Sequence, residues 1–343
     1  MVFVVYRNTY KKQSACCKRY GKTPETQQRR GAATGNISYI GAEKQLQSRY
    51  DYDILIVTVG GLQGGKGMFA GKRSKLVFGI LAVLMLIACT LVFSLSEVLM
   101  PVASGKKVLK ADKLTVDASN ADQGYIMVKG PKTKTKMKVT VEATGTKLQY
   151  DINGEGEYEV FPLQLGSTNY TISLWRQVEG KKYGKIGQVK VAPKMENELS
   201  CFLYPNQYVN YTKSSPCVKE ATEICKGVQT DAEKYKIIHD YIIKNFQYDY
   251  VKSVTVAGSS GMLPDIEGTW KSKKGICQDL AAVTCAMLRS QGIPARLVIG
   301  QLGSGTPHAW VMAVIDGEDV FFDPTAEKNA SNKSDTYTTL RLY

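Results

Sequence analysis

Between about residues 114 and 192, apolar and polar residues alternate in short runs, and turn-forming pairs such as Asn153 with Gly154 and Glu179 with Gly180 separate them. Alternation with a period of two is typical of strands that bury one face. We expect strands at residues 113–117, 124–129, 137–142, 158–161, 170–175 and 189–191. Their spacing predicts a small antiparallel β-sandwich, immunoglobulin-like in class, with no sign of catalytic chemistry.

Helical spacing follows further along the chain. Thr230 and Glu233 form a capping box, and the apolar stripe behind it is Tyr235, Ile237, Ile238, Tyr241, Ile242 and Phe246. His239 lies in this helix beside Asp240, and we expect it to be a surface residue without a catalytic role.

A second helix is predicted to begin at about Cys277 and to end before residues 291–294. Gly275 interrupts the preceding structure, and the positions that then recur at helical spacing are Leu280, Val283, Thr284, Met287 and Leu288. Cys277 therefore lies in the first helical turn. There the free backbone N–H groups and the helix dipole favour a thiolate over a thiol.

A β-hairpin is predicted after this helix. His308 begins an apolar strand over residues 308–315, and Asp316 and Gly317 are a strong turn signal. Residues 319–323 are predicted to form the second strand of the hairpin. With a two-residue loop, Asp323 lies opposite Trp310, and His308 is its diagonal neighbour on the same face. A loop one residue longer would turn Asp323 to the other face.

Cys277, His308 and Asp323 together predict a catalytic triad. Each alone has an ordinary explanation, as a small buried thiol, a structural histidine or a strand stop. The chain holds only two histidines, so a base for the thiol has few other sources. A carboxylate that holds the imidazole in one tautomer leaves its other nitrogen to address the thiol.

Three motifs around these residues resemble the transglutaminase-like core of bacterial exported proteins, within the papain-like thiol enzymes. They are Gly275-Ile-Cys277-Gln-Asp with the helix that follows it, His308-Ala-Trp310, and Asp323-Pro-Thr. The resemblance covers roughly residues 230–326. It implies that Cys277 is the nucleophile, that His308 is the general base and then acid, and that Asp323 orients His308. No calcium site is implied.

The resemblance leaves the reaction open. The thiolate would form a thioester on a peptide or glutamine carbonyl, and either water (a peptidase or amidase) or an amine (a cross-linker) would resolve it. Trp270 lies upstream where an oxyanion donor could lie, but we do not favour it. The alternative from another class is a non-catalytic envelope binding or scaffold protein that retains the fold.

Residues 76–96 form a run of 21 residues without a charge. At about 1.5 Å per residue they are long enough to cross a membrane as one helix. Lys72, Arg73 and Lys75 precede the run, which predicts that the following domains lie outside the cytoplasm. Alternatively, Met68 begins a secretory signal, with Cys89 as a lipidated cysteine. We favour an uncleaved anchor and expect export in either case.

The predicted organisation has four parts: residues 1–67, disordered or before a mis-set start; residues 68–100, a membrane anchor or signal; residues 101–195, the β-sandwich; and residues 196–343, the transglutaminase-like α+β domain. Residues 60–66 fit the pattern of a phosphate-binding loop, GxxxxGK. Gly67 stands where that loop needs a serine or threonine, so we reject a nucleotide site.

Charge and cysteine content limit the partners. The chain has 45 Lys+Arg against 31 Asp+Glu, a net charge of +14, yet the lysines are scattered, so we expect a solvated basic surface and no nucleic-acid partner. Two histidines and no CxxC pair argue against a zinc site, and we expect no cofactor.

The expected partner is a protein or peptide substrate, such as one in the cell envelope. In an oxidising compartment, Cys201 and Cys217 would be the plausible disulfide.

Overall fold

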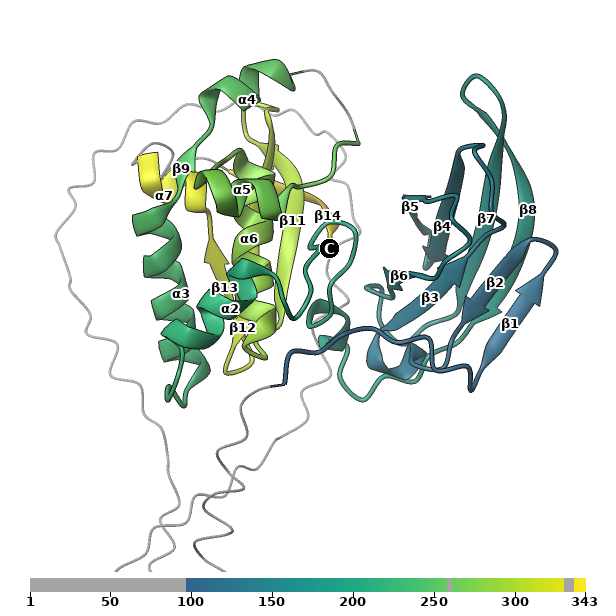
Figure 1. The fold of residues 1–343 in the computed structure, drawn as a ribbon, viewed down its shortest axis with the longest axis horizontal. Coiled ribbons are helices and arrows are strands. Elements are labelled where there is room, and N and C mark those ends of the chain that lie inside the picture. The colour runs from purple at the N-terminus through teal and green to yellow at the C-terminus, as the bar shows by residue number, and fades with distance from the viewer. Residues whose placement is uncertain (1–96, 258–260, 330–335) are drawn as a thin grey trace, which may run out of the picture. The chain divides into compact units, whose positions relative to one another are not determined.

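Figure 1 shows the fold in a computed structural model, which describes residues 97–257, 261–329 and 336–343. The described chain mixes helices with antiparallel sheets, in agreement with the predicted α+β class. The predicted membrane segment at residues 76–96, like residues 1–67, lies outside the described residues. Within the described ranges, no helix is both long and apolar enough to cross a membrane. The predicted domain boundaries stay predictions.

Residues 108–191 form two four-stranded antiparallel sheets, with strand orders β1-β2-β3-β6 and β5-β4-β7-β8. The strands are β1 (Val108–Ala111), β2 (Leu114–Asp117), β3 (Tyr125–Lys129), β4 (Met137–Ala143), β5 (Thr146–Ile152), β6 (Glu159–Pro162), β7 (Tyr170–Glu179) and β8 (Lys182–Val191). Alternate residues are buried, as Val116, Val139 and Ile172 illustrate. The immunoglobulin-like class stays a prediction.

β1 and β5 were not among the strands predicted from the sequence. β5 follows β4 through a tight turn in which Thr144 and Gly145 both have a positive φ, 50° and 78°. Two left-handed residues in a row are the requirement of a type I′ hairpin turn. Because threonine rarely adopts that conformation, the sequence alone signals this turn weakly.

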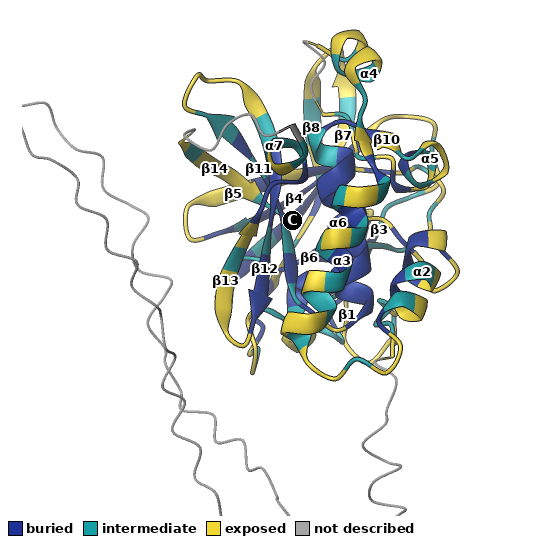
Figure 2. Ribbon diagram, turned by 90° about the vertical axis from the view of Figure 1, so that its left-hand side faces the viewer, coloured by how far each residue is buried: buried dark blue, intermediate teal, exposed yellow. Residues whose placement is uncertain are grey.

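The second part of the described chain is built on one four-stranded sheet and one central helix, with a short two-stranded sheet beside them. Its antiparallel sheet has the order β13-β12-β11-β14. Helix α6 (Cys277–Ser290) packs on β11 and β12, and every residue from Asp279 to Ser290 is buried. The strands are β11 (Ala295–Leu302), β12 (Pro307–Ile315), β13 (Glu318–Phe322) and β14 (Tyr337–Leu342). Figure 2 colours most of β12 as buried.

Shorter elements surround α6. Helices α2 (Pro216–Ile224), α3 (Asp231–Asn245) and α5 (Ile266–Ser272) pack against it. Thr230 caps α3 by accepting a hydrogen bond from the Glu233 N–H, as the capping box predicted. The remaining elements are β9 (Gln247–Tyr248), which pairs in parallel with β10 (Lys274–Gly275), α4 (Tyr250–Thr255) and α7 (Pro324–Asn329).

The predicted hairpin register is confirmed. Ile315 pairs with Glu318, and the pairing continues to Val311 opposite Phe322. The two loop residues, Asp316 and Gly317, have φ values of 52° and 85°. This register carries Asp323 to the position opposite Trp310, on the face that also bears His308.

The expected disulfide between Cys201 and Cys217 is wrong, because both cysteines are free and buried. The Cys201 thiol is directed at the Glu198 carbonyl, 3.4 Å away, whereas Cys217 lies in the first turn of α2 near Glu267 and Lys273. Each sulfur thus packs in its own surroundings.

His239 lies at the surface, as predicted, but it is partly covered and has partners there. Its side chain is only 24% exposed, and its ring nitrogens lie 3.0 Å from Asp240 and 2.8 Å from Glu327. Its ring also packs against Phe322, with the centroids 4.4 Å apart. His239 therefore links α3 to α7 and supports the end of β13.

Candidate active site

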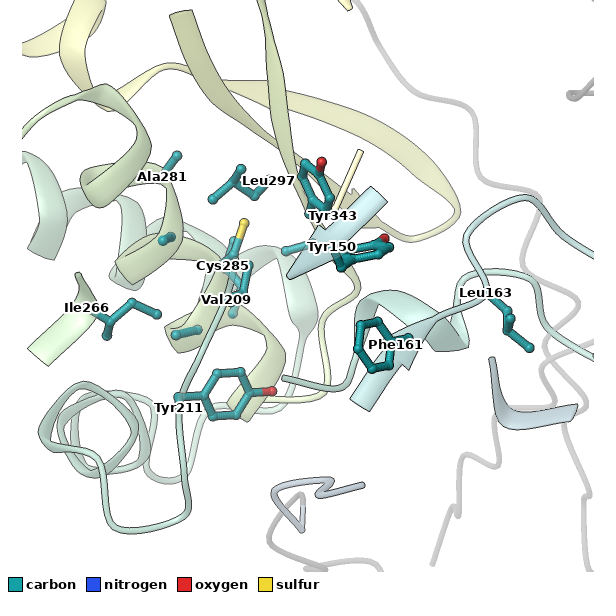
Figure 3. Packing of buried hydrophobic residues seen from close by; sticks show 14 of the residues in the cluster. Tyr150, Phe161, Leu163, Val209, Tyr211, Ile266, Ala281, Cys285, Leu297 and Tyr343 are labelled. Atoms are coloured by element: carbon teal, nitrogen blue, oxygen red, sulfur yellow. The ribbon is translucent and has the colours of Figure 1, made fainter. Parts of the chain in front are cut away.

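Cys277 is the first residue of α6, as the helical pattern predicted. Its side chain is partly exposed, whereas the other free cysteines of the described chain, Cys201, Cys217, Cys225 and Cys285, are buried. Figure 3 shows Cys285 among packed core side chains such as Leu297 and Val209. Because α6 is otherwise enclosed, its N-terminus is the end that presents a side chain to solvent.

His308 and Asp323 lie together as the hairpin register requires. His308 Nε2 donates a hydrogen bond to Asp323 Oδ2 over 2.7 Å. The Cys277 side chain lies close enough to His308 to contribute to its raised pKa. Since Nε2 is occupied by Asp323, Nδ1 is the nitrogen left to face the thiol. The structure therefore brings all three predicted residues together in the order thiol, imidazole, carboxylate.

Asp323 is held rigidly because both of its oxygens are engaged. Oδ1 accepts hydrogen bonds from the N–H groups of Thr325 and Ala326, at 2.9 and 3.0 Å, and so caps α7. Oδ2 accepts from His308 and from the Tyr337 hydroxyl, the latter at 2.9 Å. Burial opposes the ionised form, but these hydrogen bonds prevail and lower the pKa of Asp323. The carboxylate stays charged and points at the imidazole.

The pKa of His308 is raised to about 9. Burial by itself would lower this pKa, but the hydrogen bond to Asp323 and the electrostatic effects of Asp323 and Cys277 outweigh burial. The imidazolium form therefore persists through neutral pH. A proton is thus available beside the thiol for transfer to a leaving group.

Two aromatic residues support the site, and neither was assigned that role from the sequence. Tyr337, at the start of β14, donates to Asp323, and its ring lies 6.1 Å from that of His308. Trp310 lies nearly parallel to His308, with the ring centroids 6.4 Å apart. Gly300 makes room for Trp310, because a Cβ there would lie 2.4 Å from the indole ring. Trp310 follows His308 in a quoted motif, but Tyr337 had no local signal.

Trp270, considered as an oxyanion donor, belongs to a different cluster. Its ring stacks on Tyr241 at 5.9 Å, and the Lys273 ammonium lies 3.2 Å from its centroid. Tyr248 is an aromatic residue beside Cys277. Burial first, and then the charge of Cys277, raise the pKa of Tyr248.

A hollow of about 540 Å³ lies on the sheet that contains β4 and β7, and its lining does not include Cys277, His308 or Asp323. Its lining includes Trp175 and four lysines: Lys136, Lys138, Lys147 and Lys181. Lys138 and Lys147 are each paired with a carboxylate, Asp151 and Glu142, at 2.7 and 3.0 Å. We interpret this surface as a solvated basic face. Over the described part of the chain, no group of three His, Cys, Asp or Glu side chains could hold a metal ion.

Residues 219–324 match the family model of the transglutaminase-like superfamily. This part of the chain is a transglutaminase-like domain. It includes Cys277, His308 and Asp323, whereas Tyr337 lies beyond the matched range.

One curated protein and two solved structures show similarity to the chain. An uncharacterized protein of Mycobacterium leprae (strain TN) is 34% identical over 80 residues, which are 20% of this chain and 27% of that protein. The structure of a candidate cysteine protease from Cytophaga hutchinsonii is 16% identical, covering 69% of this chain and 91% of its own, with a TM-score of 0.33. The structure of a candidate protease from Parabacteroides distasonis ATCC 8503 is 15% identical. The match covers 58% of this chain and 37% of that chain, with a TM-score of 0.29. Neither structural similarity is close enough to carry an argument.

Cys277 is expected to be the fast-reacting thiol of the described chain. Burial closes Cys285 to reagents and raises its pKa to about 12, whereas Cys277 combines exposure with a histidine partner. The measurement is the rate of iodoacetamide labelling of each cysteine at pH 6, resolved by peptide mass spectrometry. Equal rates for Cys277 and Cys285 would contradict the nucleophile assignment.

Proposed function

We propose that the chain is a cysteine enzyme in which Cys277 is the nucleophile, His308 the proton carrier and Asp323 the residue that orients the imidazole. The observation that carries this proposal is that Cys277 lies beside His308, whose Nε2 is hydrogen-bonded to Asp323. A scaffold protein has no physical need for a partly exposed thiol beside an imidazole whose pKa is raised. The catalytic function therefore accounts for more of the geometry than the scaffold alternative does.

The first chemical step is acylation of the thiol. The Cys277 thiolate attacks a carboxamide or peptide carbonyl carbon, a C–S bond forms, and the C–N bond breaks. His308 gives its proton to the departing ammonia or amine, so the leaving group departs neutral. The backbone N–H of Cys277, at the start of α6, is suited to hold the oxyanion that develops on the carbonyl.

The second step releases the acyl group from sulfur. His308, now neutral, removes a proton from water or from a primary amine, which attacks the thioester carbon and displaces the Cys277 thiolate. Water gives a peptidase or amidase, and an amine gives a cross-linker. Access of water to the thioester decides between them, and the three residues serve either outcome.

We further propose that this papain-like domain acts outside the cytoplasm on protein or peptide substrates, for example in the cell envelope. The uncharged run at residues 76–96 and the basic residues before it support this placement. The two sheets of residues 108–191, which we take as an immunoglobulin-like module, would then serve to position the enzyme or bind a partner.

The reaction is tested with a library of glutamine-containing peptides, incubated with and without a primary amine and analysed by mass spectrometry. We expect products of hydrolysis or amine addition with the wild-type protein and none with Cys277→Ala. Cys285→Ala is the matched control and should keep activity, because Cys285 is buried in the core. Activity that survives in Cys277→Ala would disprove the proposed function.

The pH dependence of kcat/KM should reflect His308. Its raised pKa predicts an alkaline limb near pH 9, because above that value the imidazolium that protonates the leaving group is lost. Asp323→Ala removes a hydrogen bond that raises this pKa while burial remains, so the limb should move to lower pH. His308→Ala should reduce kcat/KM by about two to four orders of magnitude, more than Asp323→Ala.

Asp319→Ala is the control for the same strand, since Asp319 is exposed and pairs with Arg296. Melting temperatures should accompany the rates, because losing the cap of α7 by itself costs about 1 kcal/mol. An alkaline limb that stays in place in Asp323→Ala would show that Asp323 does not orient His308.

The location is tested by treating intact cells with a protease and detecting the Tyr343 end of the chain. The basic residues Lys72, Arg73 and Lys75 before residues 76–96 predict that the C-terminal end lies outside and is cut in intact cells. A C-terminal region that resists the protease until the cells are lysed would place the enzyme inside and exclude an envelope substrate.

A further inference from the structure

Asp279, two residues after Cys277, is a buried carboxylate with 0% exposure. Its Oδ2 accepts hydrogen bonds from the Ile276 N–H, at 3.0 Å, and from the Lys252 ammonium, at 2.7 Å. Its Oδ1 accepts from the Asp265 N–H at 3.1 Å. One side chain thus contacts the turn before Cys277, the start of α5 and the third residue of α4.

These contacts join three helix beginnings around the nucleophile. Asp249 caps α4 by accepting the Lys252 N–H, and Asp265 caps α5 by accepting the Gly268 N–H, both at 2.8 Å. At α6 the arrangement is reversed, because Asp279 is the third residue of the helix and accepts the N–H of the N-cap residue Ile276. Gly275 permits this fold of the chain, because a Cβ there would lie 2.8 Å from the Asp279 Cβ. The position of Cys277 therefore depends on Asp279.

The charge of Asp279 has a second consequence. A carboxylate within one helical turn of Cys277 disfavours a thiolate by Coulomb repulsion, and burial weakens the screening. The Lys252 ammonium, 27% exposed, lies against the same oxygen that holds the Ile276 N–H and offsets this repulsion. Asp279 can then shape the turn without opposing the chemistry.

Other charged or titratable groups lie on the elements that pack against α6 or adjoin those elements, and most have partners of their own. They are His308 on β12, Asp323 after β13, Tyr248 on β9, Asp249 on α4, Asp265 and Glu267 on α5, Lys274 on β10 and Tyr337 on β14. His308 is bonded to Asp323, Asp249 and Asp265 cap their own helices, and Glu267 accepts a hydrogen bond from Ser215 at 2.6 Å. Lys252 is the cation that touches Asp279.

We propose that Asp279 and Lys252 form a positioning pair for the nucleophile, in which Asp279 holds the turn that presents Cys277 and Lys252 cancels its charge so that the thiolate forms. This inference rests on the proposed role of Cys277. Neither residue contacts the reacting atoms, and both act through the place and charge environment of the thiol.

The test is the pH dependence of Cys277 alkylation by iodoacetamide in the full chain, measured by mass spectrometry of the Cys277 peptide. Lys252→Met leaves the Asp279 charge without its cation, so the midpoint should rise by about 0.5 to 1 pH unit, which slows labelling at pH 6 about three- to tenfold. Asp279→Asn removes the negative charge and leaves the cation, so the midpoint should fall. The double variant and Lys252→Arg should both lie near the wild type.

If the alkylation midpoints of Lys252→Met and Asp279→Asn shift in opposite directions, the pair acts through charge. A merely structural role would change the labelling rate, because the turn loosens, but would not move the two midpoints apart. Lys138→Met is the matched control, since it breaks another Lys–Asp pair with a 2.7 Å contact, between β4 and β5. Unshifted midpoints, or shifts of the same sign, in variants that melt like the wild type would overturn the proposal. If Asp279→Asn does not fold, the difference between Lys252→Met and Lys252→Arg decides.

The outcome is distinguishable from a failure of the proposed function. Wild-type Cys277 that reacts no faster than Cys285 at any pH would refute the nucleophile itself. A reactive wild-type Cys277 with unmoved midpoints in the variants would refute the positioning pair alone.

Discussion

The burial of helix α6 is the constraint on which the site depends. All residues from Asp279 to Ser290 are enclosed by β11 and β12 on one side and by α2, α3 and α5 around the rest. Each fully buried large apolar side chain contributes about 1.5 to 3 kcal/mol, so the axis of this helix is strongly fixed. Its N-terminus then reaches solvent with Cys277 in place and with free backbone N–H groups at hand.

The other end of α6 is tied to the sheet by a buried arginine. Arg289 is 1% exposed and donates to three backbone carbonyls, those of Ala295, Tyr204 and Tyr343, at 2.7 to 2.9 Å. Burying a charge is costly, and these carbonyl dipoles are what compensate Arg289. Because Tyr343 follows directly on β14, Arg289 helps to place the strand whose first residue, Tyr337, supports Asp323.

Asp323 shows how one side chain serves fold and chemistry together. Its Oδ1 caps α7, and its Oδ2 binds His308 and Tyr337. The cap fixes the rotamer of the carboxylate, so the imidazole meets an acceptor that does not need to be ordered during the reaction. Asp279 has a similar double role near Cys277. It accepts the Ile276 N–H and so closes the turn before α6, while Lys252 offsets its charge.

The sequence by itself determined the features that arise between residues close in the chain: the hairpin turn at Asp316 and Gly317, the helix start at Cys277, and hence the approach of His308 to Asp323. Such features follow from local backbone preferences and pairing registers, which a short segment already carries. Tertiary structure decided the rest. Tyr337 reaches Asp323 only because β14 lies beside β11 in the sheet, and Lys252 reaches Asp279 only because α4 packs at the start of α6. The free state of Cys201 and Cys217 and the link from His239 to α7 likewise depend on where separate elements meet. No local pattern encodes those distances, because they result from how the apolar faces of distant segments are buried together.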